Sequence, residues 1–133
     1  MKKTYQGSCH CGRVRFSAEI DFAAAGTSRC NCSLCTKTRL WKVFVAPADV
    51  QMLHVDEALV DYRFGGQHVR HRFCGSCGVK LFGSGGEGEQ AFMAINVAAL
   101  DDAAPEDLLS GALSLQDGRH DDWSHAPADV RLF

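Results

Sequence analysis

The sequence predicts a mainly β fold with at most a short helix near the C-terminal third. Two patterns predict the strands: apolar and polar residues alternate over 13–20, and they alternate again over 60–73 on either side of Gly65-Gly66. Such alternation places successive side chains on opposite faces, as in a half-buried strand. No segment repeats apolar residues at the three- and four-residue spacing of a long amphipathic helix. Strands should therefore dominate.

The first predicted strand, 13–20, begins just after a pair of cysteines. Its apolar face consists of Val14, Phe16, Ala18 and Ile20. Two more short strands are expected at 41–46 and 50–55, and they are separated at Pro47 because proline cannot donate a hydrogen bond to a β-ladder. These three segments supply the first half of the expected sheet structure.

The second half begins with a hairpin. Residues 60–64 and 69–73 alternate around the two glycines, and the hairpin delivers the chain to Cys74. Further strands are expected at 79–82 and 92–97, on either side of the glycine-rich segment 83–88. A short helix is expected from Pro105, because proline and the acidic residues after it suit the first turn of a helix. The tail from Leu113 is expected to be less regular, with a turn at Asp117-Gly118.

Length and charge limit the classes of protein to consider. A chain of 133 residues is expected to form one domain over 1–133. The formal net charge of −2, with both signs interspersed, predicts no nucleic-acid or anionic-membrane partner. The N-terminus lacks the apolar stretch of a signal peptide, so a cytoplasmic location is expected.

The seven cysteines fall into three clusters: Cys9 and Cys11; Cys30, Cys32 and Cys35; and Cys74 and Cys77. In a reducing cytosol, clustered cysteines favour metal ligands or reactive thiols over disulfides, and an odd number cannot be fully paired within one chain. Zinc prefers four thiolate or imidazole ligands in structural sites and three protein ligands in catalytic ones. The grouping therefore predicts one closed zinc site and one open site.

The closed site combines the first and last clusters. The two residues between Cys74 and Cys77 allow the chain to turn back on one ion, and the natural partners are Cys9 and Cys11. A metal held by all four would close a long loop and stabilise the fold. We expect His10 to point away from this site.

The open site consists of Cys30, Cys32 and Cys35, for which the sequence leaves three interpretations. A histidine among His68, His71, His120 and His125 could complete a second structural zinc site. The Cys32-x-x-Cys35 spacing could instead belong to a metal-free redox centre. In the third interpretation the fourth position is exchangeable, and a soft zinc centre with three thiolates would then select a sulfur-bearing substrate.

Taken together, the motifs resemble those of the glutathione-dependent formaldehyde-activating enzyme family, which also includes the centromere protein V type. The segments that carry the resemblance are Gly7–Gly12, Cys30–Cys35, Arg72–Gly78, Asn96-Val97, and Asp117–Arg119 with Trp123. The resemblance implies a β-tent fold of short antiparallel sheets clipped by a structural zinc on Cys9, Cys11, Cys74 and Cys77. It also implies a second, catalytic zinc on Cys30, Cys32 and Cys35. Because an open site of three thiolates is exposed to oxidants, this zinc is expected to be lost more easily.

The implied activity is that of a carbon–sulfur lyase. Such an enzyme acts on the adduct of glutathione, or of another small thiol, with a small carbon electrophile such as an aldehyde. Arg39, Arg119 or Lys37 could hold the carboxylates of glutathione. The alternative is a non-catalytic zinc-binding module that interacts with another protein, which a fourth protein ligand at the open site would favour.

Overall fold

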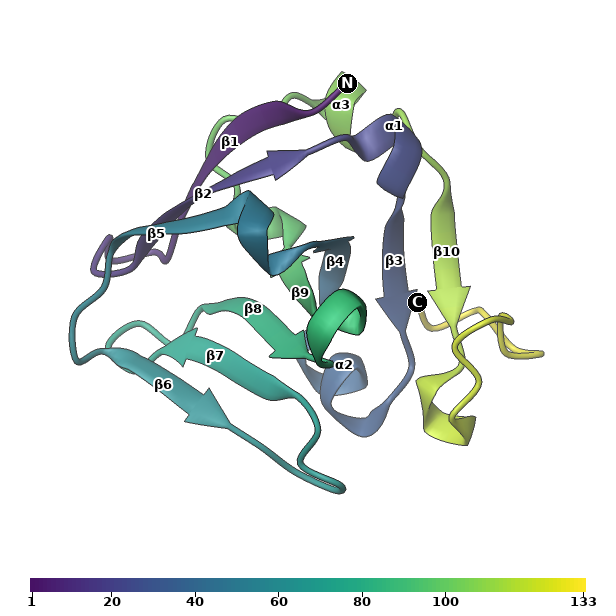
Figure 1. The fold of residues 1–133 in the computed structure, drawn as a ribbon. Helices are drawn as coiled ribbons and strands as arrows, with labels where there is room; N and C mark the ends of the chain where they lie inside the picture. The colour runs from purple at the N-terminus through teal and green to yellow at the C-terminus, as the bar shows by residue number, and fades with distance from the viewer.

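The computed structural model describes residues 1–133 and confirms the mainly β prediction. The strands form a three-stranded sheet and a seven-stranded sheet. The smaller sheet has the order β1-β2-β5 and is antiparallel, with bounds Lys3–Ser8, Arg15–Ile20 and Val50–His54. In Figure 1 this sheet lies across the top, and the larger sheet curves from β10 at the right to β6 at the bottom. The two sheets thus lean together around a shared interior.

The larger sheet has the order β10-β3-β4-β9-β8-β7-β6. In chain order its strands are β3 (Thr27–Cys30), β4 (Trp41–Val45), β6 (Leu59–Tyr62), β7 (Arg70–Cys74), β8 (Lys80–Gly85), β9 (Phe92–Asn96) and β10 (Leu113–Gln116). The predicted hairpin is confirmed, because β6 pairs antiparallel with β7. So are the strands predicted near 41–46, 79–82 and 92–97.

One pair of strands differs from the antiparallel pairing found elsewhere in the two sheets. Strand β10 runs parallel to β3, and Leu113 pairs with Thr27. The prediction of an irregular tail from Leu113 was therefore wrong at this point. Each of these two strands has only four residues, too few for alternation to be recognised, and their pairing satisfies backbone groups that would otherwise be unpaired at the sheet edge.

Strand β1 was not predicted from the sequence, and Gly7 explains why. The buried positions of β1 are Tyr5 and Gly7, so the inward face contains a glycine where an apolar side chain would reveal the strand. The ring of Phe16 occupies the space beside Gly7, where a Cβ atom would lie 2.3 Å from the ring. The strand pattern is hidden because an aromatic ring from β2 fills the position.

Three short α-helices are present where the sequence predicted at most one. The predicted helix is α3 (Pro105–Leu108), and the two unpredicted ones are α1 (Phe22–Ala25) and α2 (Ser33–Thr38). Helices of four to six residues are too short to show periodicity. Single 3₁₀ turns lie at Pro47–Asp49, Gly88–Gln90, Val97–Ala99 and Gly118–His120. Of these elements, α2 matters most, because it carries Cys35.

The core lies between the two sheets. The apolar face predicted for the first strand is buried, with Val14 and Phe16 fully enclosed. Phe16 of β2 meets Phe82 of β8 edge to face, with ring centroids 5.8 Å apart. Aromatic pairs in this geometry contribute roughly 1 kcal/mol beyond the area that they bury. The pair therefore joins the two sheets directly.

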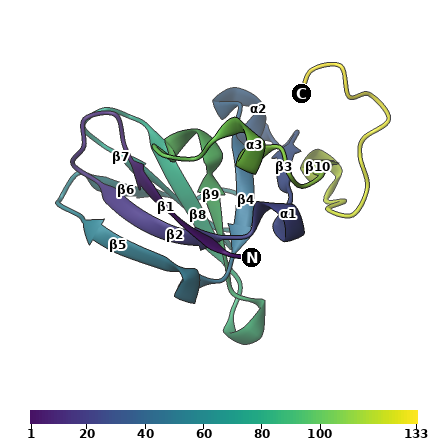
Figure 2. The ribbon, with the colours of Figure 1, turned by 90° about the horizontal axis from the view of Figure 1, so that it is seen from above.

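The C-terminal segment extends away from the sheets and returns, so that the C-terminus lies near β3 and α2 (Figures 1 and 2). This places residues from the end of the chain beside Cys30 and Cys35. None of the helices is long and apolar enough to cross a membrane.

Candidate metal centres

The four-cysteine cluster brings together the residues predicted for the closed site. Cys9 and Cys11 lie between β1 and β2 of the smaller sheet, and Cys74 and Cys77 lie at the end of β7 and in the turn before β8. All four sulfurs lie within 4.8 Å of one another. The cluster thus joins the two sheets at one point.

The spacing of these sulfurs fits zinc. The Sγ atoms of Cys9 and Cys11 are 3.6 Å apart, and those of Cys11 and Cys74 are 3.7 Å apart. Sulfurs that share a tetrahedral zinc at about 2.3 Å are separated by about 3.8 Å. The four thiols are therefore preorganised for one tetrahedral ion.

Both halves of this cluster have the same backbone conformation. The N–H of the first cysteine donates to the carbonyl five residues later, Cys9 to Val14 and Cys74 to Val79, each at 3.0 Å. The glycine that follows the second cysteine has φ of 79° in one half and 80° in the other, a left-handed conformation that favours glycine. His10 lies in the first turn and is exposed, as expected for a side chain that points away from the cluster.

The three-cysteine cluster lies where strand β3 passes into helix α2. Cys30 ends the strand, Cys32 caps the helix, and Cys35 faces inward from the first turn. The three sulfurs lie within 4.8 Å of one another. Backbone N–H groups donate to two of them at 3.3 Å, from Cys32 to the sulfur of Cys30 and from Cys35 to that of Cys32. The three cysteines thus lie at a strand-to-helix junction.

The crowding of three thiols determines how they ionise. Hydrogen bonds from Cys30 and Cys35 lower the pKa of Cys32. The pKa of Cys35 is raised, first by its hydrogen bond with Cys30 and then by that with Cys32 and by burial. One negative charge therefore opposes the formation of the next, and a divalent cation would allow all three to ionise together. The donor set suits a soft ion such as zinc.

None of the histidines joins this cluster. His120 and His125 direct Nδ1 to the carboxylates of Asp117 and Asp122 at 2.9 Å and 3.1 Å. His71 lies 2.9 Å from the Nζ of Lys80, and His68 is exposed. The fourth protein ligand that a second structural site requires is therefore absent from the three-cysteine cluster.

Asn31, between the first two cysteines of this cluster, holds the junction against the chain after β10. Its Nδ2 donates to Asp117 Oδ1 at 2.8 Å. Its Oδ1 accepts from the N–H of Arg119 at 3.0 Å, and its carbonyl accepts from the Arg119 guanidinium at 3.1 Å. No role was predicted for Asn31, although its position between two cysteines pointed to the site.

Replacing Asn31 with alanine is expected to loosen the three-cysteine cluster. The change leaves Asp117 without its amide donor and the Arg119 N–H without its acceptor, so the affinity of the cluster for a metal should fall by about 10- to 100-fold, as for other groups that orient metal ligands. Competition with a chelator would measure this. The four-cysteine cluster serves as the internal control, and an equal loss at both clusters would contradict a local role.

Gly118 packs directly against Cys30. A Cβ atom at this position would lie 2.5 Å from the Cys30 sulfur and 2.7 Å from the Trp123 ring. We therefore expect Gly118→Ala to displace Cys30 and to weaken metal binding at the three-cysteine cluster by about tenfold or more. Chelator competition on the variant and the parent protein measures the effect. Unchanged affinity would show that the Gly118 turn can move without disturbing the sulfur.

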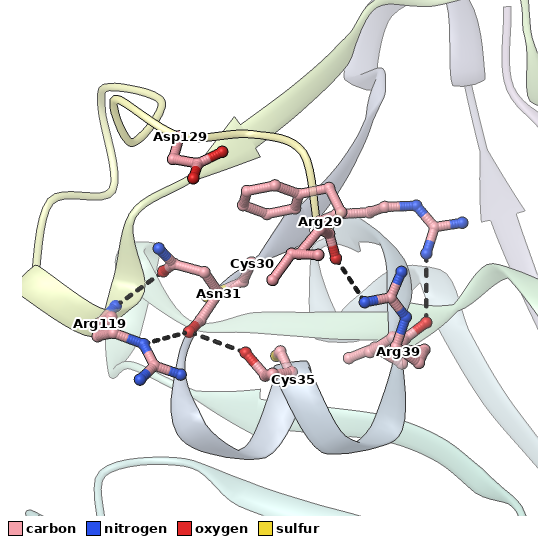
Figure 3. Close-up of a pocket in the computed structure, with 11 residues that line it drawn as sticks. Arg29, Cys30, Asn31, Cys35, Arg39, Arg119 and Asp129 are labelled. Atoms are coloured by element: carbon pink, nitrogen blue, oxygen red, sulfur yellow. Dashed lines mark hydrogen bonds between the residues drawn. The ribbon is translucent and has the colours of Figure 1, made fainter.

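A cavity of about 290 Å³ opens beside the three-cysteine cluster, and Cys30 and Cys35 are among its lining residues. Three guanidinium groups also line it, from Arg29, Arg39 and Arg119 (Figure 3). Of the residues considered for carboxylate binding, Arg39 and Arg119 thus lie at the cavity, whereas Lys37 does not line it. Arg29 was not recognised from the sequence because it lies in a strand that was itself missed.

The cavity carries an excess of positive charge. None of its three arginines forms a salt bridge, and Arg29 and Arg39 use one N–H each on backbone carbonyls. Asp129, the one acidic residue of the lining, pairs with Arg131 at 2.7 Å. Unpaired guanidinium groups bind carboxylates strongly, so the cavity suits an anionic ligand.

The fold and the two clusters define a mainly β protein with two groups of cysteines that could each hold a metal ion. A family model described as "Glutathione-dependent formaldehyde-activating enzyme" matches residues 4–112, and the chain belongs to this family. The resemblance inferred from the cysteine motifs is thereby confirmed. At the level of the family, the function is glutathione-related activation of formaldehyde.

A solved structure has a similar fold. A crystal structure of a Rhodobacter sphaeroides protein is 28% identical to the chain, with a TM-score of 0.68. The match covers 82% of this chain and 99% of that one. The family match ends at residue 112, so Asp117–Arg119 and Trp123 lie beyond it, and their likeness to the family stays a prediction.

Proposed function

We propose that the protein is a zinc-dependent carbon–sulfur lyase that acts on the adduct of glutathione, or of another small thiol, with a small aldehyde. Cys9, Cys11, Cys74 and Cys77 hold a structural zinc in this proposal. Cys30, Cys32 and Cys35 hold the catalytic one. The observation that carries the proposal is a three-sulfur cluster without a fourth protein ligand, beside a cationic cavity.

The reaction makes or breaks one carbon–sulfur bond. In the forward direction the thiol sulfur adds to the aldehyde carbon, the carbonyl π electrons move to oxygen, and the thiol proton ends on that oxygen. In the reverse direction the hydroxyl loses its proton, the carbonyl re-forms, and the sulfur leaves with the bonding electron pair. A free thiol of pKa about 8.5 is only a few per cent ionised at neutral pH, so catalysis requires a thiolate at this position. A bound zinc would stabilise the substrate's sulfur in its thiolate form.

The residues of the cavity bind and orient the rest of the substrate. Glutathione carries carboxylates at both ends, and the guanidinium groups of Arg39 and Arg119 lie on the lining to receive them. Arg119 is itself held by Asn31, the residue between two of the cysteines. Binding a carboxylate there would therefore place the thiol of the same molecule close to the cluster.

The experiment that tests this proposal combines metal analysis with thiol binding. Two zincs per chain are expected, together with saturable glutathione binding and faster equilibration of glutathione with formaldehyde than in buffer. Arg39→Gln should raise the KM for glutathione about tenfold with a smaller change in kcat, since it removes ground-state binding. Two bound zincs with neither thiol binding nor turnover would refute the catalytic role.

A further inference from the structure

A buried lysine without a hydrogen-bond partner lies behind the three-cysteine cluster. Lys42 of β4 is 5% exposed, and its Nζ has no partner. The ring of Phe44 lies nearby, with its centroid 5.6 Å from Nζ. Burying an ammonium group is costly unless a charge compensates it. A nearby anion would therefore stabilise Lys42 in its charged form.

The sheet register places Lys42 on the face that carries Cys30. Lys42 pairs with Ser28 across strands β4 and β3, and Cys30 follows two residues after Ser28. Residues two apart in a strand share a face, and so do direct cross-strand partners. The Oγ of Ser28 is also buried and unpartnered. Two unsatisfied polar groups thus lie side by side on the face of the metal-binding cluster.

A second lysine, Lys80 of β8, belongs to the same cationic group. Its carbonyl accepts from Nδ2 of Asn96 at 2.8 Å, and Asn96 pairs with Lys42 across β9 and β4. Burial lowers the pKa of Lys80, and the charges of Cys35 and Cys32 act in the opposite direction, towards the ammonium form. The Nζ of Lys80 lies 2.9 Å from Nδ1 of His71. Burial, and then the charge of Lys80, lower the pKa of His71 to about 4, so this imidazole is neutral near pH 7 and adds no charge. No carboxylate forms a salt bridge with either lysine.

We propose that Lys42 and Lys80 select an anionic sulfur ligand, a thiolate, for the exchangeable position of the Cys30–Cys32–Cys35 centre. This inference rests on the proposed function. A divalent ion with three thiolates carries about −1. The two ammonium groups bring the buried group to about +1, so a thiolate neutralises it, whereas water or imidazole leaves the positive charge in place. In a medium of low dielectric constant this difference favours the anion.

The test measures ligand binding directly rather than turnover. Cobalt(II) replaces zinc in the intact protein, and thiolate-to-cobalt charge-transfer absorption reports sulfur binding. The probes are 2-mercaptoethanol, a thiol without a carboxylate, and imidazole, a neutral ligand. In Lys42→Met and Lys80→Met we expect the affinity for 2-mercaptoethanol to fall about tenfold each, which corresponds to the loss of one compensating charge. The affinity for imidazole should stay the same or rise.

Lys37→Met is the matched control, because this lysine lies two residues from Cys35 but is exposed. It should bind both probes as the parent protein does. Lys42→Arg keeps the charge and should bind 2-mercaptoethanol more tightly than Lys42→Met. If Lys42→Met fails to fold, Lys42→Gln takes its place as the uncharged variant.

The outcomes separate the two proposals. Thiol affinity that is unchanged in the Lys42 and Lys80 variants overturns the selection by lysine and leaves the lyase proposal standing. An equal loss of thiol and imidazole affinity also overturns it, since that result indicates damage to the centre as a whole. A parent protein that binds no thiol overturns both proposals.

Discussion

Replacing Cys74 with serine is expected to unfold the protein. Cys74 is fully buried and lies at the end of β7, where the four-cysteine cluster connects the two sheets. Zinc held by such a cluster contributes on the order of 10 kcal/mol in apparent terms, whereas domains of this kind have net stabilities of only about 5–15 kcal/mol. Losing one of four ligands, and leaving a hydroxyl in an apolar core, should remove most of the free energy of unfolding.

Circular dichroism and heat denaturation, with and without a chelator, measure this effect. The parent protein should lose its cooperative transition when a strong chelator removes the metal, and the Cys74→Ser variant should lack that transition without chelator. His10→Ala is the matched control. It lies between two residues of the cluster but is exposed, so its stability should change by less than about 0.5 kcal/mol. A Cys74→Ser variant as stable as the parent would refute the structural role of the cluster.

Replacing Cys32 with serine is expected to abolish lyase activity while the fold is retained. The three-cysteine cluster lies at the end of β3 and in α2, apart from the larger core that joins the sheets. Loss of a ligand should halve the zinc content. Mutating residues that only orient metal ligands lowers metal affinity or activity by about 10- to 100-fold. Loss of a ligand itself should therefore lower the activity by more than about 100-fold.

The measurement pairs zinc content and melting temperature with the rate of glutathione–formaldehyde equilibration. Ser33→Ala, at the next residue, is the matched control: Ser33 is exposed, and its side chain makes no hydrogen bond within the protein, so activity and zinc content should be kept. If Cys32→Ser lost zinc from both clusters, or lost activity only because it unfolded, the assignment of separate roles would be contradicted.

Much of the β structure and the membership of both cysteine groups could be predicted from local patterns. The alternation around Phe16 identified a strand because every second side chain of β2 meets the core. The spacing of Cys74 and Cys77 identified a knuckle because two intervening residues suit a single ion. Strand β1 was missed because Gly7 stands where an apolar side chain would complete the alternation. Strand β3 and helix α2 were missed because they have only four and six residues.

The contacts that complete the site leave no local pattern. Asn31 and Asp117 are 86 positions apart in the chain, and their hydrogen bond depends on the parallel pairing of β10 with β3. In the sequence, Lys42 is the one charged residue of a short predicted strand, and nothing local marks it as buried. Its burial behind the three-cysteine cluster depends on which strands flank β4.

Residue identity and short spacing were thus sufficient to predict a mainly β protein and to sort seven cysteines into groups of four and three. The pairing of sheets determined the rest: which face each group lies on, which arginines line the cavity, and which lysines lie behind the sulfurs. The physical reason is that metal-ligand spacing and alternation are properties of adjacent residues. Burial and electrostatic environment are produced by neighbours in space, which the order of the strands brings together.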